Sequence, residues 1–207
     1  MPSVASAPPG DDLIAIGADL APGTLLEAYR NGLFPMPIDP ARRRSKIAWY
    51  SPDPRGVMPL DGMRVSRSLR RSAKRYRVTM NQDFAGVIRA CADPSRPGYW
   101  ITAEIIDAYE RMFELGWAHS VEVWADDDLV GGLYGLRING LFAAESMFHW
   151  ATDASKVALF HLVGWVNDTD ASLLDVQWST PHLASLGVVE VGRAEYLHRL
   201  VAATSES

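Results

Sequence analysis

The sequence predicts a mixed α/β domain with a small N-terminal lobe. Strand-like and helix-like segments alternate from residue 78 onward, in the expected order β-α-α-β-β-β-α-β-α-β-α. About sixty residues rich in proline and glycine come before them. Hydrophobic residues make up 48% of the 207-residue chain, which is ordinary for a domain that buries its own core. We therefore expect a lobe over residues 1–62 and a larger domain over residues 63–207.

The N-terminal lobe offers one clear helix, at residues 22–30. Pro22 suits a first helical turn, and Asn31-Gly32 suits the end of the helix. The first ten residues are small and proline-rich, and they lack the basic start and apolar stretch of a secretory signal. We expect these ten residues to form a frayed tail.

A second helix should begin at Ser66, a plausible N-cap, and run to about Tyr76. Four cations lie at i, i+3, i+4 and i+7 along it and so share one face, opposite Leu69. The surrounding segment, residues 42–77, holds 12 Lys and Arg but two acids, although the whole chain carries a net charge of −5. This pattern favours contact with nucleic-acid phosphates, and a solvated basic face is the alternative. The four cations are Arg67, Arg70, Arg71 and Lys74.

A strand at residues 78–80 precedes two amphipathic helices. Asp83 and Thr102 are their expected N-caps, and Gly116 ends the second. Cys91 has core spacing on the first helix, so we reject it as a nucleophile; as the only cysteine, it also excludes a disulfide.

The remaining segments complete the predicted sheet. Asn139-Gly140 is a strong hairpin signal between two strands. Asp153 is the expected cap of a long helix that follows them. The expected strands are residues 119–124, 129–137, 141–148, 173–177 and 188–191, and the expected helices are residues 153–166, 181–186 and 194–203.

Three polar residues of these strands are candidates for chemistry. Asp175 and Gln177 are two apart in one strand, so both point to one face, where they could hold an amine and an ester carbonyl. Loop capping is the alternative role. Glu145 lies in an apolar strand, where an acid costs free energy unless it has a partner. It is either a salt-bridge anchor or a receptor for a cationic ligand.

Glycines and aromatic residues give two further indications. The middle strand carries no side chain at Gly131, Gly132 and Gly135. Glycine at these positions permits either close approach of a ligand or a bulge. Trp49, Tyr50 and Trp100 lie in loop-like surroundings, where they could stack on bases or seal the two lobes together. The three aromatic residues therefore keep two interpretations.

Several classes of protein are excluded by missing motifs. The chain has no G-x-S-x-G elbow, no phosphate-binding glycine loop and no histidine spacing suited to a metal. No apolar run reaches the ~18 residues that a membrane-spanning helix needs. We expect no metal, no cofactor and no membrane partner. A chain with one cysteine and no signal is expected in the cytoplasm.

The order of elements is that of GNAT-type acyltransferases up to the last strand, which is a fold analogy only. The stretch from His149 to Ser155 has no glycine, so it lacks the pyrophosphate turn that an acetyl-CoA-dependent member needs. Nine motifs, taken together and in order, resemble the leucyl/phenylalanyl-tRNA–protein transferases over about residues 12–200. They are residues 31–36 (NGLFPM), 49–56 (WYSPDPRG), 66–69 (SRSL), 99–102 (YWIT), 119–122 (HSVE), 131–135 (GGLYG), 145–148 (ESMF), 154–156 (ASK) and 174–177 (LDVQ).

The resemblance implies transfer of Leu or Phe from aminoacyl-tRNA to proteins with an N-terminal Arg or Lys, which marks them for degradation. It implies that Trp49 and Trp100 hold the terminal adenosine of the tRNA. It also implies that Asp175, Gln177 and Glu145 form the reaction centre. Since a carboxylate accepts hydrogen bonds, we expect Asp175 to orient the acceptor amine.

Two carboxylates match a cationic acceptor, and an apolar donor side chain needs an aliphatic pocket. Two other functions stay open: a GNAT acetyltransferase that uses acetyl-CoA, and a tRNA-binding module without catalysis. The candidates for the donor pocket are Leu133, Met147, Leu159, Leu162 and Leu174.

Overall fold

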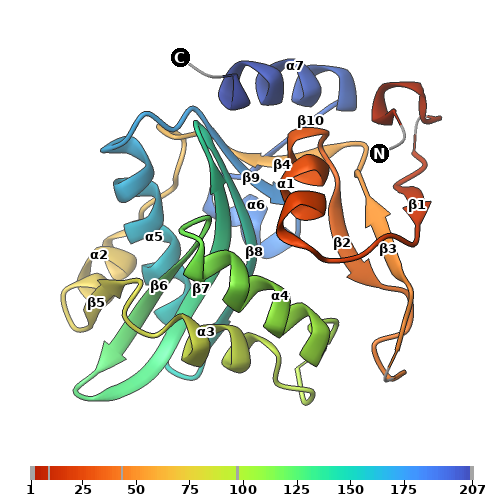
Figure 1. Cartoon of the computed structure of the whole chain (residues 1–207). Coiled ribbons are helices and arrows are strands. Elements are labelled where there is room, and N and C mark those ends of the chain that lie inside the picture. The colour runs from red at the N-terminus through yellow and green to blue at the C-terminus, as the bar shows by residue number, and fades with distance from the viewer. Residues whose placement is uncertain (1–2, 9, 43, 97, 206–207) are drawn as a thin grey trace.

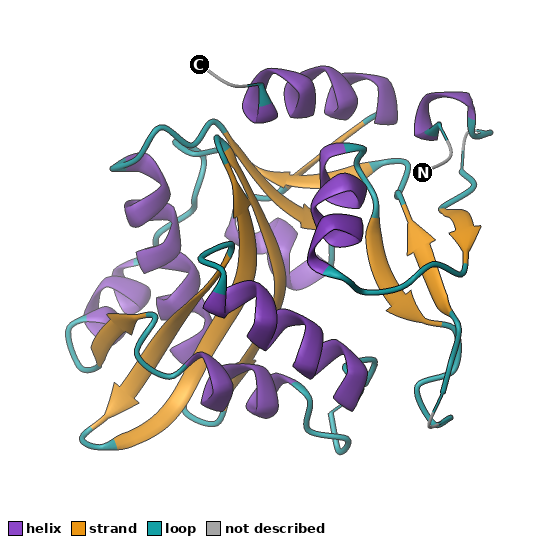
Figure 2. Ribbon diagram, in the orientation of Figure 1, coloured by secondary structure: helices purple, strands orange, loops and turns teal. Residues whose placement is uncertain are grey.

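A computed structural model describes residues 3–8, 10–42, 44–96 and 98–205, and it confirms the mixed α/β class. Two sheets lie side by side in Figures 1 and 2. The smaller has three strands in the order β1-β3-β2, and the larger has seven in the order β10-β4-β9-β8-β7-β6-β5. The parallel pair in the larger sheet is β8–β9, and its other paired neighbours are antiparallel.

The N-terminal lobe is built around the small sheet. The predicted helix is confirmed as α1, and its Pro22 occupies the first turn. The three strands of the sheet were not predicted, because each has four residues and one contains two prolines. The elements are η1 (Val4–Ser6), β1 (Leu13–Ile16), α1 (Pro22–Arg30), β2 (Phe34–Pro37) and β3 (Ile47–Tyr50).

The start of the chain is docked, so the expectation of a frayed tail is wrong for the described residues. Val4 is buried. The guanidinium of buried Arg193 donates to the carbonyl oxygens of Ala7, Pro8 and Asp11. Arg193 therefore fixes these three residues against the helix near the other end of the chain.

The large sheet includes one strand from before residue 62. β4 pairs with β9 on one side and β10 on the other, although the expected boundary assigns it to the N-terminal lobe. The strands are β4 (Arg55–Met58), β5 (Arg77–Met80), β6 (Ala118–Ala125), β7 (Asp128–Ile138), β8 (Leu141–His149), β9 (Leu173–Gln177) and β10 (Val189–Val191).

Helices cover both faces of the large sheet (Figure 1). On one face, α3 and α4 pack on β7 residues such as Tyr134 and Leu136, and Cys91 is buried among them, as its core spacing predicts. On the other face, α5 and α2 pack on Leu133. The helices are α2 (Arg67–Ala73), α3 (Phe84–Cys91), α4 (Ala103–Glu114), α5 (Ala154–Asn167), α6 (Pro181–Leu186) and α7 (Arg193–Thr204).

The predicted helix ends need three corrections. Thr102 stands at the N-cap position of α4 but makes no side-chain cap. Ser66 caps α2 through a bond from the Leu69 N–H, but the helix ends at Ala73 rather than near Tyr76. Asp153 stands at the N-cap position of α5 with φ 64° and makes no side-chain cap; its carboxylate accepts from Ser72 and Lys156 instead. No helix in the described part of the chain is long and apolar enough to span a membrane.

Candidate active site

A β-bulge in β8 exposes Glu145 to the site. Ala144 pairs with Gly135 and Ser146 pairs with Tyr134, so Glu145 is the extra residue between them. A bulge bends the strand and re-aims a side chain. A Cβ on Gly135 would collide with the Ala143 carbonyl oxygen, so the close strand approach at the bulge requires glycine.

The other two glycines of β7 also allow close packing within the protein. A Cβ on Gly131 would lie 2.5 Å from the side chain of Ala154 on α5, and a Cβ on Gly132 would lie 2.7 Å from the Val121 carbonyl oxygen. Of the two interpretations of these glycines, the bulge holds at Gly135, whereas Gly131 and Gly132 allow close packing of the chain on itself.

Three side chains donate hydrogen bonds to the Glu145 carboxylate. Tyr29 Oη lies 2.6 Å from Oε1, Tyr109 Oη lies 3.2 Å from Oε2, and Gln177 Nε2 lies 3.0 Å from Oε1. The donors come from α1, α4 and β9, which are far apart in sequence. Tyr29 Oη and Tyr109 Oη also lie within hydrogen-bond distance of each other; each hydroxyl has one hydrogen, so when both donate to Glu145 none is left for this contact. Glu145 is thus the point at which three separate segments of the chain meet.

Burial dominates the titration of this group. It raises the pKa of Glu145 from 4.5 to about 7, although the Tyr29 hydrogen bond opposes the rise, and the nearby charge of Asp175 adds to it. Burial and the Glu145 charge also raise the pKa of Tyr29 and Tyr109, so both hydroxyls stay protonated. Glu145 can therefore exchange a proton near neutral pH while its neighbours remain donors.

Asp175 is held in a buried ion pair with Arg55. Its Oδ1 accepts from Arg55 Nε at 2.8 Å and from the Gln177 N–H at 2.9 Å; its Oδ2 accepts from Arg55 Nη2 at 2.6 Å and from Tyr196 Oη at 2.8 Å. A carboxylate has about four lone-pair positions, and all are occupied. Asp175 therefore has no site left for an acceptor amine, which corrects the expectation of direct contact.

Arg55 keeps its charge despite complete burial. Burial disfavours the cation, but Asp175, Tyr196 and Glu145 together outweigh it, so the pKa of Arg55 lies above its usual value. The guanidinium also donates to the Gly32 carbonyl oxygen at 3.1 Å and lies over the rings of Phe34 and Tyr196. This pair joins the N-terminal lobe to the large sheet.

A pocket opens where β8 and β9 stop pairing. The strands pair from Leu141–Leu173 to Ala143–Asp175; after that β8 continues to His149, while β9 ends at Gln177 in a left-handed conformation with φ 60°. Glu145 and Gln177 lie on the pocket wall. The apolar lining is Leu133, Ala144, Met147, Leu159, Val176 and Leu183.

Five residues were expected to form a donor pocket, and three of them line the apolar pocket: Leu133, Met147 and Leu159. The other two do not. Leu162 and Leu174 have no exposed surface and belong to the core between α5 and the sheet. The sequence does not distinguish core leucines from pocket leucines, because both face the same layer.

The aromatic candidates divide between core and surface. Trp49 is 1% exposed and donates through Nε1 to the Gly17 carbonyl oxygen, so its ring offers no face to a base. This corrects the expected adenosine contact. Trp100 is half-buried and lines a separate hollow beside Ser146. Tyr50 is half-buried against Trp178, which directly follows Gln177.

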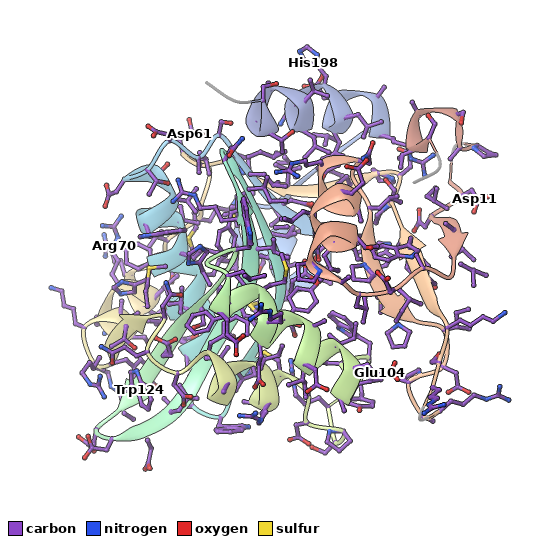
Figure 3. All side chains as sticks on the ribbon, in the orientation of Figure 1. Asp11, Asp61, Arg70, Glu104, Trp124 and His198 are labelled. Atoms are coloured by element: carbon purple, nitrogen blue, oxygen red, sulfur yellow. The ribbon has the colours of Figure 1, made fainter. Side chains whose placement is uncertain are left out.

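The predicted cationic face of α2 is present on the surface. Leu69 is buried, whereas the four cations on the opposite side are exposed. Figure 3 shows Arg70 at the outer side of the molecule, beside α5. Arg55 belongs to the same basic segment of the sequence but is buried, so it adds nothing to this surface. The exposed cations are Arg67, Arg70, Arg71 and Lys74.

Four residues of the site were missed by sequence reasoning. Arg55 is part of the motif at residues 49–56 and is the first residue of β4. A cation at the start of an apolar strand could have indicated a buried partner for Asp175. Tyr29, Tyr109 and Tyr196 have ordinary helical core spacing, and no signal marks their hydroxyls as ligands of a carboxylate. Sequence patterns report which face is buried but not which buried hydroxyls meet an acid.

Comparison with known proteins agrees with this arrangement. The profile of the leucyl/phenylalanyl-tRNA protein transferase matches residues 57–201, and that of its N-terminal domain matches residues 18–53. Leucyl/phenylalanyl-tRNA–protein transferases from Pseudoalteromonas atlantica and Ruegeria sp. are 48% and 47% identical; each match covers 93% of this chain, and 82% and 89% of those proteins.

Solved structures give distant likenesses. A ribosomal-protein-alanine N-acetyltransferase from Brucella melitensis has 16% identity and a TM-score of 0.40, over 51% of this chain and 81% of its own. L-PGS from Bacillus licheniformis has 13% identity and a TM-score of 0.42, over 72% and 56%.

The family profiles and the similar relatives define an aminoacyltransferase. The chain belongs to the leucyl/phenylalanyl-tRNA protein transferase family, and both parts of that family's architecture are present in it.

Proposed function

We propose that this enzyme moves Leu or Phe from aminoacyl-tRNA onto the α-amine of proteins that begin with Arg or Lys. The observation that carries the proposal is the pairing of an apolar pocket with one carboxylate, Glu145, on its wall. No Lys or Arg within the described residues forms a salt bridge with Glu145. The Asp175 charge, in contrast, is neutralised by Arg55. An arriving cation therefore has Glu145 as its partner.

Proton transfer is assigned to Glu145. An α-amine has a pKa of about 7.7–8.0 and arrives protonated, so it must lose a proton to attack the ester carbonyl. With its pKa raised to about 7, Glu145 is close enough in proton affinity to accept it. The new C–N bond then forms, the nitrogen loses a second proton, and the ester C–O bond breaks. One of the two protons leaves on the ribose oxygen and the other passes to water.

Gln177 and Asp175 have supporting roles in this proposal. Gln177 donates through Nε2 to Glu145, which leaves its amide oxygen available to accept from the amine. Asp175 accepts the Gln177 N–H and so holds the strand end in its left-handed conformation. We therefore regard Asp175 as a positioning residue, and most of the catalytic gain comes from geometry and one proton transfer.

The tRNA itself is assigned to the cationic face of α2, with Trp100 next to its terminal adenosine. The reaction belongs in the cytoplasm, where aminoacyl-tRNA is made, and its products carry an N-terminal Leu or Phe that marks them for degradation.

The experiment is a transfer assay with radiolabelled Leu-tRNA and otherwise identical peptides that begin with Arg, Lys, Asp or Gly. We expect label in the Arg and Lys peptides. The matched variant Glu145→Gln keeps the size of the side chain and removes its charge, so it should lose both rate and preference for a cation. Equal transfer to the Asp peptide would refute the proposed acceptor, and absence of transfer to every peptide would refute the activity.

A further inference from the structure

A second hollow lies beside the site, and no role has been given to its arginine. It adjoins β8 at Ser146, a residue that also lines the apolar pocket, whose leucines lie on the opposite face of the sheet. Its lining is aromatic and polar. The residues are Cys91, Arg96, Gly98, Tyr99, Trp100 and Ser146.

Arg96 is fixed in this hollow by backbone oxygens. Its Nη1 donates to the Cys91 carbonyl oxygen at 2.6 Å, and its Nη2 donates to the Met147 carbonyl oxygen at 2.6 Å. Those bonds join the end of α3 to the part of β8 that has no β9 partner. The side chain is half-buried, so its orientation is set before any ligand arrives.

The charge of Arg96 is not neutralised by these contacts. Both acceptors are neutral carbonyls, and no carboxylate in the described part of the chain lies within salt-bridge distance of it. The charge of Arg96 lowers the pKa of the Asp93 carboxyl, but this effect is the smallest of its causes, and the hydrogen bond from the Ser95 N–H is the largest. A guanidinium has five N–H donors, so three remain for a ligand.

We infer that Arg96 binds the phosphate on the 5′ side of the donor's terminal nucleoside; this rests on the proposed function. An aromatic residue beside a fixed, unneutralised guanidinium suits a nucleotide, because the ring stacks on the base and the fork binds phosphate. Ser146 lines both this hollow and the apolar pocket and directly follows Glu145. A nucleotide bound here therefore lies beside the strand that carries the proposed base.

The test compares two minimal donors, 3′-phenylalanyl-adenosine with and without a 5′-phosphate. For the wild-type enzyme, kcat/KM should be about tenfold higher with the phosphate, as expected for one charge-assisted contact. In Arg96→Gln the ratio should fall to about one, and Arg96→Lys should keep part of it. Arg89→Gln is the matched control, since Arg89 is an exposed arginine of α3 paired with Glu110, and it should leave the ratio unchanged.

If Arg96 has a purely structural role, Arg96→Gln lowers kcat/KM by the same factor for both donors, and their ratio stays at the wild-type value. That outcome would overturn the inference. Calorimetric binding of 5′-AMP and adenosine separates the inference from the activity. If the wild-type enzyme transfers nothing yet prefers 5′-AMP, and Arg96→Gln abolishes that preference, the proposed function fails and the phosphate site stands. Equal affinity of the wild-type enzyme for 5′-AMP and adenosine would refute the phosphate site.

Discussion

Arg55 and Asp175 form a bidentate ion pair in which neither side chain has any exposed surface. One partner comes from β4, near the N-terminal lobe, and the other from β9, whose last residue lines the apolar pocket. Pairs of this kind stabilise little relative to an apolar core, but the loss of one partner leaves a bare buried charge. Folding and the geometry of the site therefore depend on the same contact.

Asp175→Ala should destabilise the fold as well as slow the reaction. Loss of one partner of a buried pair costs about 3–5 kcal/mol, and for a chain of this size that lowers the melting temperature by roughly 6–20 °C. The matched control is Arg199→Ala, which breaks the exposed Arg199–Glu195 pair and should cost less than ~1 kcal/mol. Melting curves that coincide for wild type and Asp175→Ala would contradict this role.

The rate should rise with pH through the pKa of Glu145. Its carboxylate form is the base, and burial raises that pKa from 4.5 to about 7, so kcat/KM should increase from pH 6 to 8 and then level off. Glu145→Gln should remove this limb and lower the rate by about 10²- to 10⁴-fold. A pH profile of the variant parallel to that of the wild type would assign the limb to another group.

The same group should make stability depend on pH in the opposite direction. The folded pKa lies above the unfolded one, so the folded protein holds a proton that the unfolded chain has lost between pH 4.5 and 7. The Glu145 contribution is therefore complete below pH 4.5 and is lost as the pH rises through about 7, by roughly 3 kcal/mol in all. The difference in unfolding free energy between wild type and Glu145→Gln, measured in urea at pH 4.5 and 7.5, should show this decline; no change with pH would refute it.

The two tryptophans should respond differently to truncation. Trp100→Ala should weaken donor use about 5- to 150-fold, since base stacking contributes ~1–3 kcal/mol, and should leave the fold intact. Trp49→Ala removes a core side chain and should cost about 3–5 kcal/mol of stability. Circular dichroism melts together with donor titrations separate the two effects. A stable Trp49→Ala variant with weak donor binding would restore the adenosine role of Trp49.

Neutralising the α2 face should change the salt dependence of tRNA binding. Each lost phosphate contact flattens the slope of log affinity against log salt by roughly 0.7–0.9, so Arg70→Gln with Arg71→Gln should remove about twice that amount. Arg111→Gln, on α4 and paired with Glu114, is the control and should keep the wild-type slope. An unaltered slope in the double variant would place the tRNA elsewhere.

The elements that could be predicted from sequence are those whose pattern repeats over several residues. Helices α1, α3 and α4, and strands β6 to β9, follow from apolar periodicity and turn residues at their ends. Strands β1 to β4 could not be predicted, since they are short and lie in a segment rich in proline and glycine, and their pairing comes from distant segments.

The candidate polar residues of the site could be singled out from the sequence, but the contacts that connect them to their partners could not. Glu145 was singled out because an acid in an apolar strand is costly, and Asp175 and Gln177 because their spacing places both on one face of a strand. The partner that neutralises Asp175 lies 120 positions away in sequence, and no local pattern connects it to that acid. The bulge that presents Glu145 is marked in the sequence by Gly135. A glycine in a strand can have several roles, however, so it does not by itself predict a bulge.

The position of β4 between β9 and β10 affects how the protein is made. Met58 leaves the ribosome roughly 115 residues before Leu173 does, a delay of about 6–23 s at ordinary translation speeds. Throughout that interval Arg55 has no Asp175 to pair with. The reaction centre is therefore assembled late in synthesis, and a nascent chain that stops before β9 lacks both Asp175 and Gln177.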